Sequence, residues 1–291
     1  MTKTLILHVQ NAEMNKYNST LLLLLSLLFV TSSCSSTFNQ LMKTDDYDFK
    51  YEAAKEYFTE GKYTKAATLL QEVVNMNKGT DKGEENLYML GMAEFCLKDY
   101  EASSEYFKKY ASSYPKGIYV ENAYYYYAQS LYNSTPEVAL DQSDTYSAIK
   151  AFQEYIDLFP ESKLKETAQQ KLFVLQDKLV QKELLNAQLY YDLGPYFGNC
   201  SSGTENNYES CIITAQNALK DYPYTSYREE FSLLIMKSKY ALANQSVEEK
   251  KLDRYRDAED ECYGFINEYP DSKEKETALK YIAHCKKYLK D

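Results

Sequence analysis

The sequence predicts an all-α protein built from stacked pairs of helices, and three observations carry this prediction. First, a pattern of an aromatic residue, a small residue three places later and a second aromatic residue four places after that recurs every 37 residues. Second, 9 Gly and 6 Pro are too few for the many turns of an all-β fold. Third, Pro115, Pro160, Pro223 and Pro270 each follow an aromatic residue at the end of an amphipathic segment, where proline stops a helix.

The recurring pattern places its three side chains near one side of a helix, because residues three and four apart are neighbours there. Its three copies are Tyr51, Ala54 and Phe58; Tyr88, Gly91 and Phe95; and Tyr125, Ala128 and Tyr132. A fixed period between about 20 and 50 residues is typical of repeat arrays. Such arrays present extended surfaces for binding other polymers.

The first two helix pairs can be placed from the apolar spacing. We expect a helix over 47–60, a turn at Gly61 and Lys62, and a second helix from Tyr63. In the second helix, Ala66, Leu70 and Val73 form one buried stripe. The next pair is expected over 84–97 and from Tyr100, and the small residue of each first helix allows close approach to its partner.

The later pairs carry insertions, which we expect at 134–144, 194–207 and 244–251, and a helix over 273–290 caps the chain. Leu90, Gly91, Tyr100, Phe107 and Pro115 resemble the tetratricopeptide repeat. This resemblance implies a right-handed superhelix of about five helix pairs with the capping helix at its C-terminal end. The array is predicted over 47–291, with repeats 1–3 over 47–160 and repeats 4–5 with the cap over 161–291.

In such a superhelix the first helix of each pair lines the inner face, and its side chains are candidates for a peptide-binding groove. The candidates are Tyr51, Lys55, Phe58, Tyr88, Met92, Phe95, Tyr125, Gln129 and Tyr132. Tyrosine and methionine suit a groove that receives an extended or helical peptide with aromatic anchors. The alternative is that these aromatic residues fill contacts between repeats.

The N-terminus has the pattern of a targeting segment. Lys16 precedes the apolar run 21–30, and small residues follow it, so residues 1–33 are predicted to be a cleaved signal peptide, with Met14 as a possible true start. The stretch before Cys34 resembles the lipobox of bacterial lipoproteins, which implies lipid on Cys34 and a membrane anchor. Thr31 departs from that motif, and an ordinary secretory signal with an incidental cysteine is the alternative. Residues 34–46 are predicted to be the lipidated N-terminus and a polar tether.

Five further cysteines show no C-x-x-C spacing, and only two histidines are present, so no metal site is predicted. Cys200 and Cys211 flank a Ser/Gly/Asn-rich loop and are a possible disulfide, while Cys262 and Cys285 could meet between neighbouring helices. Small apolar packing is the alternative for Cys96 and for all four of these.

No nucleotide-binding or hydrolase motif appears, so neither a cofactor nor an enzymatic activity is predicted. Acidic pairs such as Glu229 and Glu230 are interpreted as charges that complement helix dipoles. The net charge of −10 excludes broad nucleic-acid binding.

The stretch from Leu140 onward resembles the BamD family, the lipoprotein subunits of the outer-membrane β-barrel assembly machine. The matching segments are 141–143 (DQS), 159–162 (FPES), the long amphipathic helix ending at Tyr190 and Tyr191, and 222–225 (YPYT). The resemblance covers about residues 34–291, although the loop 198–207 is longer than expected and 245–262 is only loosely similar.

The resemblance implies a non-enzymatic scaffold on the periplasmic face of the outer membrane, held by lipid on Cys34. Its N-terminal repeats would bind unfolded outer-membrane β-barrel proteins, and its C-terminal repeats would bind the barrel subunit BamA. One alternative is another periplasmic repeat lipoprotein that serves cell division or pilus assembly. A second is an enzyme or glycan-binding lipoprotein, which would need an additional domain.

Overall fold

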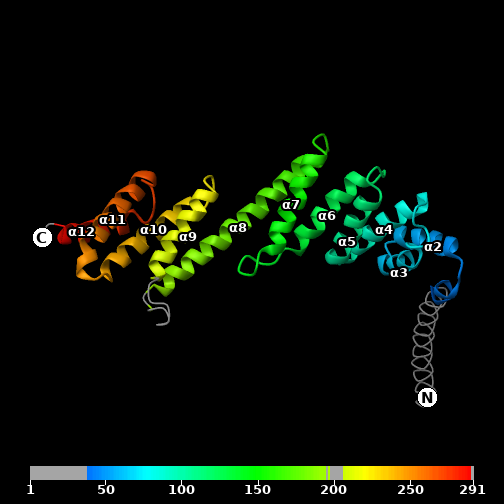
Figure 1. Ribbon diagram of the computed structural model, residues 1–291, viewed down its shortest axis with the longest axis horizontal. Helices are drawn as coiled ribbons and strands as arrows, with labels where there is room; N and C mark the ends of the chain where they lie inside the picture. The colour runs from blue at the N-terminus through cyan, green and yellow to red at the C-terminus, as the bar shows by residue number, and fades with distance from the viewer. Residues whose placement is uncertain (1–37, 195, 197–205, 290–291) are drawn as a thin grey trace, which may run out of the picture. The chain divides into compact units, whose positions relative to one another are not determined.

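The computed structural model describes residues 38–194, 196 and 206–289, and the predicted signal peptide and Cys34 lie outside this part. All regular secondary structure in the described residues is helical (Figure 1). The helices are α2 (Tyr47–Thr59), α3 (Tyr63–Val73), α4 (Asp81–Leu97), α5 (Tyr100–Ser113), α6 (Val120–Ser134), α7 (Ser143–Leu158), α8 (Lys165–Leu193), α9 (Asn207–Asp221), α10 (Arg228–Asn244), α11 (Glu248–Glu268) and α12 (Lys275–Tyr288). These bounds confirm the predicted helix pairs, and the third insertion is shorter than expected because α11 already begins at Glu248.

The chain divides into two compact units, and the division falls between Ser130 and Leu131, within α6. The sequence had placed its subdivision at residue 160. The structure differs because α7, the second helix of the third pair, packs along α8. This contact joins α7 to the C-terminal repeats.

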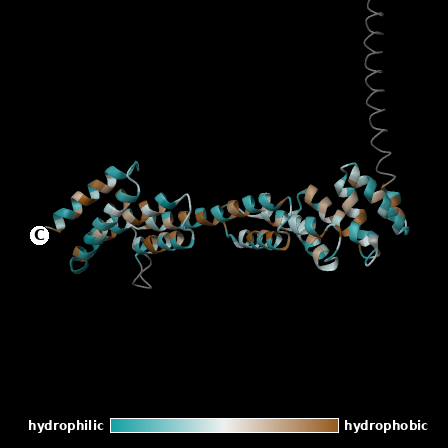
Figure 2. Cartoon of the chain, turned by 90° about the horizontal axis from the view of Figure 1, so that it is seen from above, coloured by the Kyte–Doolittle hydropathy of each residue, from teal (hydrophilic) through white to brown (hydrophobic). Residues whose placement is uncertain are grey.

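Unit 1 is held together by the stripe predicted for the first hairpin. Ala66, Leu70 and Val73 of α3 are fully buried, and α2 and α4 both pack against this helix. Gly61 has a φ of +75°, so the turn between α2 and α3 uses a conformation that glycine adopts without strain. Apolar and polar stretches alternate along the helices, as Figure 2 shows, which is the expected pattern for helices that bury one face.

The second helix of each later pair ends at an aromatic residue immediately before proline. Tyr114, Phe159, Tyr222 and Tyr269 occupy these end positions, with φ between −125° and −130°. Each donates its backbone N–H to the carbonyl four residues earlier, and the proline then prevents a further helical turn. The predicted helix stops are therefore confirmed.

The insertion between α6 and α7 is an ordered loop organised by Gln142. The buried amide of Gln142 donates to the carbonyl oxygens of Glu137, Val138 and Leu140 at 2.8, 3.3 and 3.0 Å. Its own oxygen accepts from the Thr145 hydroxyl at 2.7 Å. Because one side chain satisfies three loop carbonyls, the loop has a defined course within unit 2.

Unit 2 continues with α8, which packs against both α7 and α9, followed by the α9–α10 and α11–α12 contacts (Figure 1). Phe231, Ala215 and Cys211 are fully buried between α9 and α10, and Phe265, Ala278 and Ile282 are buried between α11 and α12. Small residues at these contacts allow the helices to approach closely.

The described part of the predicted tether is packed against the array. Residues 38–43 are helical, and Leu41 is buried against the first hairpin. Lys50, which is itself buried, donates to the Met42 carbonyl at 3.2 Å and pairs with Glu72 of α3. The segment therefore has a fixed position on unit 1 from Phe38 onward.

Candidate functional site

The nine residues predicted to line a groove lie on the first helices of the first three pairs. Tyr51, Lys55 and Phe58 lie on α2, Tyr88, Met92 and Phe95 on α4, and Tyr125, Gln129 and Tyr132 on α6. The small residues between them pack as predicted, since Ala54 and Ala128 are fully buried. A Cβ atom on Gly91 would lie 2.9 Å from the Phe107 ring, which explains the glycine.

Within unit 1, Tyr51 and Lys55 of α2 meet Glu85 of α4. The Tyr51 hydroxyl donates to one Glu85 carboxylate oxygen, and the Lys55 ammonium lies 3.0 Å from the other. Burial opposes ionisation of Glu85, but the hydrogen bonds from Tyr51 and Lys55 lower the pKa of this carboxyl. Burial and the bond to Glu85 raise the pKa of Tyr51 far above its ordinary value. The ionised carboxylate thus joins the two first helices.

The sequence analysis missed Glu85, although a signal for it exists. Tyr51 and Glu85 are 34 residues apart, and the ion pair between Asp48 and Lys82 spans the same distance. Two polar pairs with the same 34-residue spacing therefore indicate contacts between the first helices of neighbouring repeats. The repeating pattern consists of aromatic and small residues, so Lys55 was found by its place between them and its acidic partner on the next first helix was not.

Burial corrects the groove prediction for three of its residues. Tyr51 is 1% exposed, and Tyr125 and Gln129 are each 8% exposed. Side chains this deeply buried fill contacts between helices and do not form an open lining. The alternative interpretation, that aromatic residues fill inter-repeat contacts, therefore holds for Tyr51 and Tyr125.

Tyr88 lies in an aromatic cluster between α4, α5 and α6. Its ring stacks on Tyr119 at a centroid distance of 4.4 Å and meets the edges of Phe107 and Tyr110 at 5.7 and 5.9 Å. Burial raises the pKa of Tyr88 to about 12, so its hydroxyl stays protonated at neutral pH. Phe95 joins the same cluster. Such edge and stacked pairs position the rings rigidly.

A half-buried set remains on unit 1 after these assignments. It consists of Lys55, Phe58, Tyr88, Met92 and Phe95. Rigid aromatic rings and an adaptable methionine can contact apolar side chains of a peptide at small entropic cost. The Lys55 ammonium adds a positive charge to this set and is already paired with the Glu85 carboxylate.

Tyr132 belongs to unit 2, where it meets the long helix α8. The Lys171 ammonium lies 4.5 Å from the centre of the Tyr132 ring, a cation–π distance. The edge of Phe152 from α7 supports the same ring at 6.3 Å. The sequence analysis did not identify Lys171, because the contact spans the insertion between α6 and α7.

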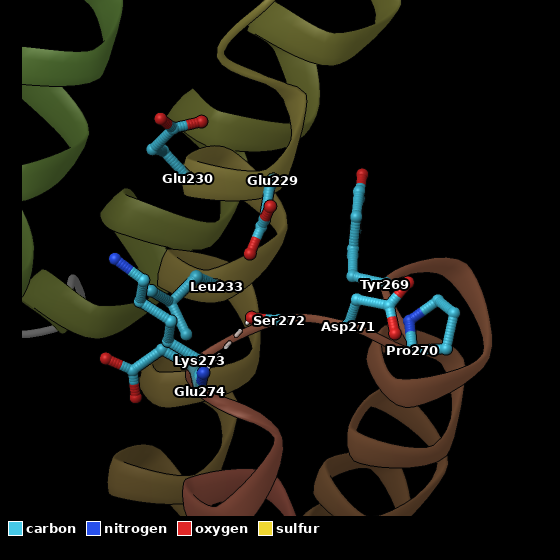
Figure 3. Close-up of a pocket in the computed structure, with 9 residues that line it drawn as sticks. All are labelled: Glu229, Glu230, Leu233, Tyr269, Pro270, Asp271, Ser272, Lys273 and Glu274. Atoms are coloured by element: carbon cyan, nitrogen blue, oxygen red, sulfur yellow. Dashed lines mark hydrogen bonds between the residues drawn. The ribbon is translucent and has the colours of Figure 1, made fainter.

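A cavity of about 600 Å³ lies in unit 2 between the start of α10 and the turn between α11 and α12 (Figure 3). Glu229, Glu230 and Leu233 line it from α10, and residues 269–274 line it from the turn. Glu229 and Glu230 occupy the first turn of α10, where carboxylates complement the helix dipole, as the sequence analysis interpreted them.

Cys96, Cys262 and Cys285 are free thiols, and Cys211 has no disulfide partner among the described residues. Cys211, Cys262 and Cys285 are buried, and burial raises the pKa of Cys262 to about 12 and that of Cys285 to about 11. Such thiols stay protonated and unreactive at neutral pH. Cys96 is exposed. Cys200 lies outside the described residues, so its pairing with Cys211 stays a prediction.

Within residues 38–194, 196 and 206–289, no cluster of three or more His, Cys, Asp or Glu side chains could hold a metal ion. No helix in that part of the chain is long and apolar enough to span a membrane.

The fold and these surfaces define a tetratricopeptide-like helical-repeat protein, a class whose members bind other chains. Residues 44–199 match the model of the YfiO family, described as an outer membrane lipoprotein. Because this match covers more than half of the chain, the chain belongs to the YfiO family of outer membrane lipoproteins.

The chain is also similar to the outer membrane protein assembly factor BamD of Rickettsia prowazekii (strain Madrid E). The two are 26% identical over 129 residues, which are 44% of this chain and 51% of that protein. The chain therefore spans about half the length of the curated relative it matches.

Two solved structures of tetratricopeptide-like repeats from a putative Podosopora anserina kinesin light chain also match, at 10% identity and a TM-score of 0.31. They cover 77% and 84% of this chain, and 96% and 97% of their own. This likeness is too low to carry an argument.

Proposed function

We propose that this protein is a non-enzymatic scaffold subunit of an outer-membrane β-barrel assembly complex. The observation that carries the proposal is the family match over residues 44–199, supported by the relative named as an outer membrane protein assembly factor. The resemblance to the BamD family in the segments 141–143, 159–162 and 222–225 points in the same direction.

In this proposal the N-terminal repeats bind unfolded outer-membrane β-barrel proteins. The half-buried set on unit 1 supports this role, because Phe58, Tyr88, Met92 and Phe95 supply apolar contact area that is already ordered. An unfolded β-barrel strand alternates apolar and polar side chains, so its aromatic residues can contact these rings while its backbone stays solvated.

The C-terminal repeats bind the barrel subunit BamA. The feature that supports this role is a stripe of exposed leucines on α8, at Leu185, Leu189 and Leu193, which are 48%, 56% and 40% exposed. Their spacing of four residues aligns them on one face of the helix. An exposed apolar stripe of this kind is typical of a protein–protein interface.

The protein is anchored by lipid on Cys34 and lies on the periplasmic face of the outer membrane. Only residues 35–37 separate Cys34 from Phe38, whose ring packs edge-on to Tyr57 of α2 at 5.8 Å. At a maximum of about 3.6 Å per residue, this link keeps Phe38, which contacts the first helix pair, within roughly 15 Å of the lipid attachment. The first repeats would then receive clients close to the membrane.

The proposal is tested by purifying the tagged protein from detergent-solubilised outer membranes and identifying its partners by mass spectrometry. We expect a stoichiometric BamA-type barrel subunit with the wild-type chain, and its loss with the variant L185D/L189D. The variant L279D, which alters a leucine of α12 that is 50% exposed, is the matched control and should retain the subunit. Cell-division or pilus proteins in place of a barrel subunit would overturn the proposal.

A further inference from the structure

Lys171 and Lys178 lie on one face of α8, because seven residues are close to two full helical turns. This face packs against the end of α6 and the insertion that follows it. The Lys171 ammonium lies over the Tyr132 ring at 4.5 Å, and the Lys178 ammonium donates to the Thr135 hydroxyl at 2.8 Å. One cation therefore lies over the Tyr132 ring, and a second lies two turns further along α8 on the residue that follows α6.

Neither cation has an acidic partner in the part of the chain that the structure describes. The ion pairs found there involve other lysines and arginines. Burial lowers the pKa of both Lys171 and Lys178, and no neighbouring carboxylate compensates for it. Half-buried ammonium groups without an anion are unusual in a chain whose net charge is −10.

The two lysines differ in what they do for the fold. Lys178 holds the insertion in place through Thr135, and Lys182 does the same through the Ala139 carbonyl at 2.6 Å. Lys171 donates no hydrogen bond to any described residue, and its ammonium is held only by the Tyr132 ring. An ammonium has three donors, so those of Lys171 remain available for a ligand.

We propose that Lys171 and Tyr132 form a subsite for a carboxylate group of a bound polypeptide, with Lys178 adding positive potential. The Lys171 ammonium donates to the carboxylate, and the Tyr132 ring, supported by Phe152, forms an apolar wall for the adjoining side chain. This inference rests on the proposed function and extends the client-binding surface from the third repeat, which holds Tyr132, to α8, because it names a group by which a client is recognised. The carboxylate can come from the chain terminus or from an acidic side chain.

The experiment measures the affinity of the purified full chain for a fluorescein-labelled peptide of the C-terminal strand of an outer-membrane β-barrel protein. One version of the peptide carries a C-terminal amide, and a second carries Asn or Gln in place of each Asp or Glu. Each is titrated by fluorescence anisotropy against wild-type protein, K171Q and K171R. K280Q is the matched control, because Lys280 is an exposed lysine on α12. Thermal melts confirm that each variant is folded.

We expect one of the two neutralised peptides to bind the wild type on the order of tenfold more weakly, the effect of losing one charge-assisted hydrogen bond. The peptide version that loses affinity identifies the source of the carboxylate. K171Q should bind the original peptide as weakly as the wild type binds the neutralised one, and its affinity should not change when the peptide is neutralised. K171R and K280Q should keep the wild-type affinity and the wild-type response to neutralisation.

Binding to the wild type that is unchanged by both neutralisations would overturn the carboxylate subsite and leave the proposed function intact. An equal loss of affinity in K171Q and in the wild type on neutralising the peptide would also overturn the carboxylate subsite. Complete failure of the wild-type chain to bind the peptide would overturn client binding, and the subsite with it.

Discussion

Replacing Gly91 with alanine should destabilise unit 1, although alanine is the better helix former. Gly91 lies inside α4, where alanine is favoured over glycine by about 1 kcal/mol. A Cβ atom at this position would lie 2.9, 3.1 and 3.1 Å from three atoms of the Phe107 ring. Phe107 is fully buried between Tyr88 and Tyr126, so the ring has no space into which it can move.

Overpacking of this kind costs about 1–3 kcal/mol, and the middle of that range, about 2 kcal/mol, exceeds the gain in helix propensity of about 1 kcal/mol. We therefore expect a net destabilisation of about 1 kcal/mol for Gly91→Ala. Gly264 provides the matched control, because it lies inside α11 with nothing within 4 Å of its added Cβ atom. Gly264→Ala should stabilise its helix by about 0.5–1 kcal/mol, so the same substitution should change the free energy of unfolding in the opposite direction at the two positions.

Urea unfolding followed by circular dichroism measures the stability change, and hydrogen exchange with mass spectrometry assigns it to α4 and α5 or to α11. The double variant Gly91→Ala with Phe107→Leu should show favourable coupling, because the smaller side chain relieves the contact. If Gly91→Ala stabilises α4 as much as Gly264→Ala stabilises α11, the close-packing argument is refuted.

Three further predictions concern buried polar groups. Glu94→Gln should stabilise the protein at neutral pH but not in acid. Burial raises the pKa of Glu94, so the stability contributed by its protonated carboxyl is complete below the unfolded pKa and is lost as the pH rises through the folded pKa. Urea unfolding across the pH range measures this dependence. Tyr51→Phe should cost about 1 kcal/mol and raise the pKa of Glu85 toward its ordinary value, which an NMR titration of that carboxyl measures, and an unchanged pKa would contradict it. Lys50→Met should speed amide exchange in residues 38–43 without unfolding α2, and unaltered protection there would show that this lysine does not hold the segment.

Much of the fold follows from local chemistry that a sequence displays. The stripe of Ala66, Leu70 and Val73 has helical spacing and a single buried face, so its role needs no knowledge of distant residues. The helix stops before Pro115 and Pro160 are equally local, because proline blocks the next turn whatever surrounds it.

The candidate sites were harder to predict because they depend on neighbours far along the chain. Tyr51 has the spacing of a groove residue, but Glu85 of the next first helix covers its hydroxyl and buries it. Lys171 meets Tyr132 across an insertion and the whole of α7, so no local pattern links the two residues. Helix periodicity identifies the face on which a side chain lies and does not determine how much of it the neighbouring repeat covers.

The central claim, that this lipoprotein serves β-barrel assembly, is tested most directly by depleting it in its native cell. Folded outer-membrane β-barrel proteins are then quantified by their heat-modifiable migration in isolated outer membranes. We predict that the folded forms decline as the protein is depleted, and that the wild-type chain restores them while L185D/L189D does not. Unchanged levels of folded β-barrel proteins after complete depletion would contradict the account.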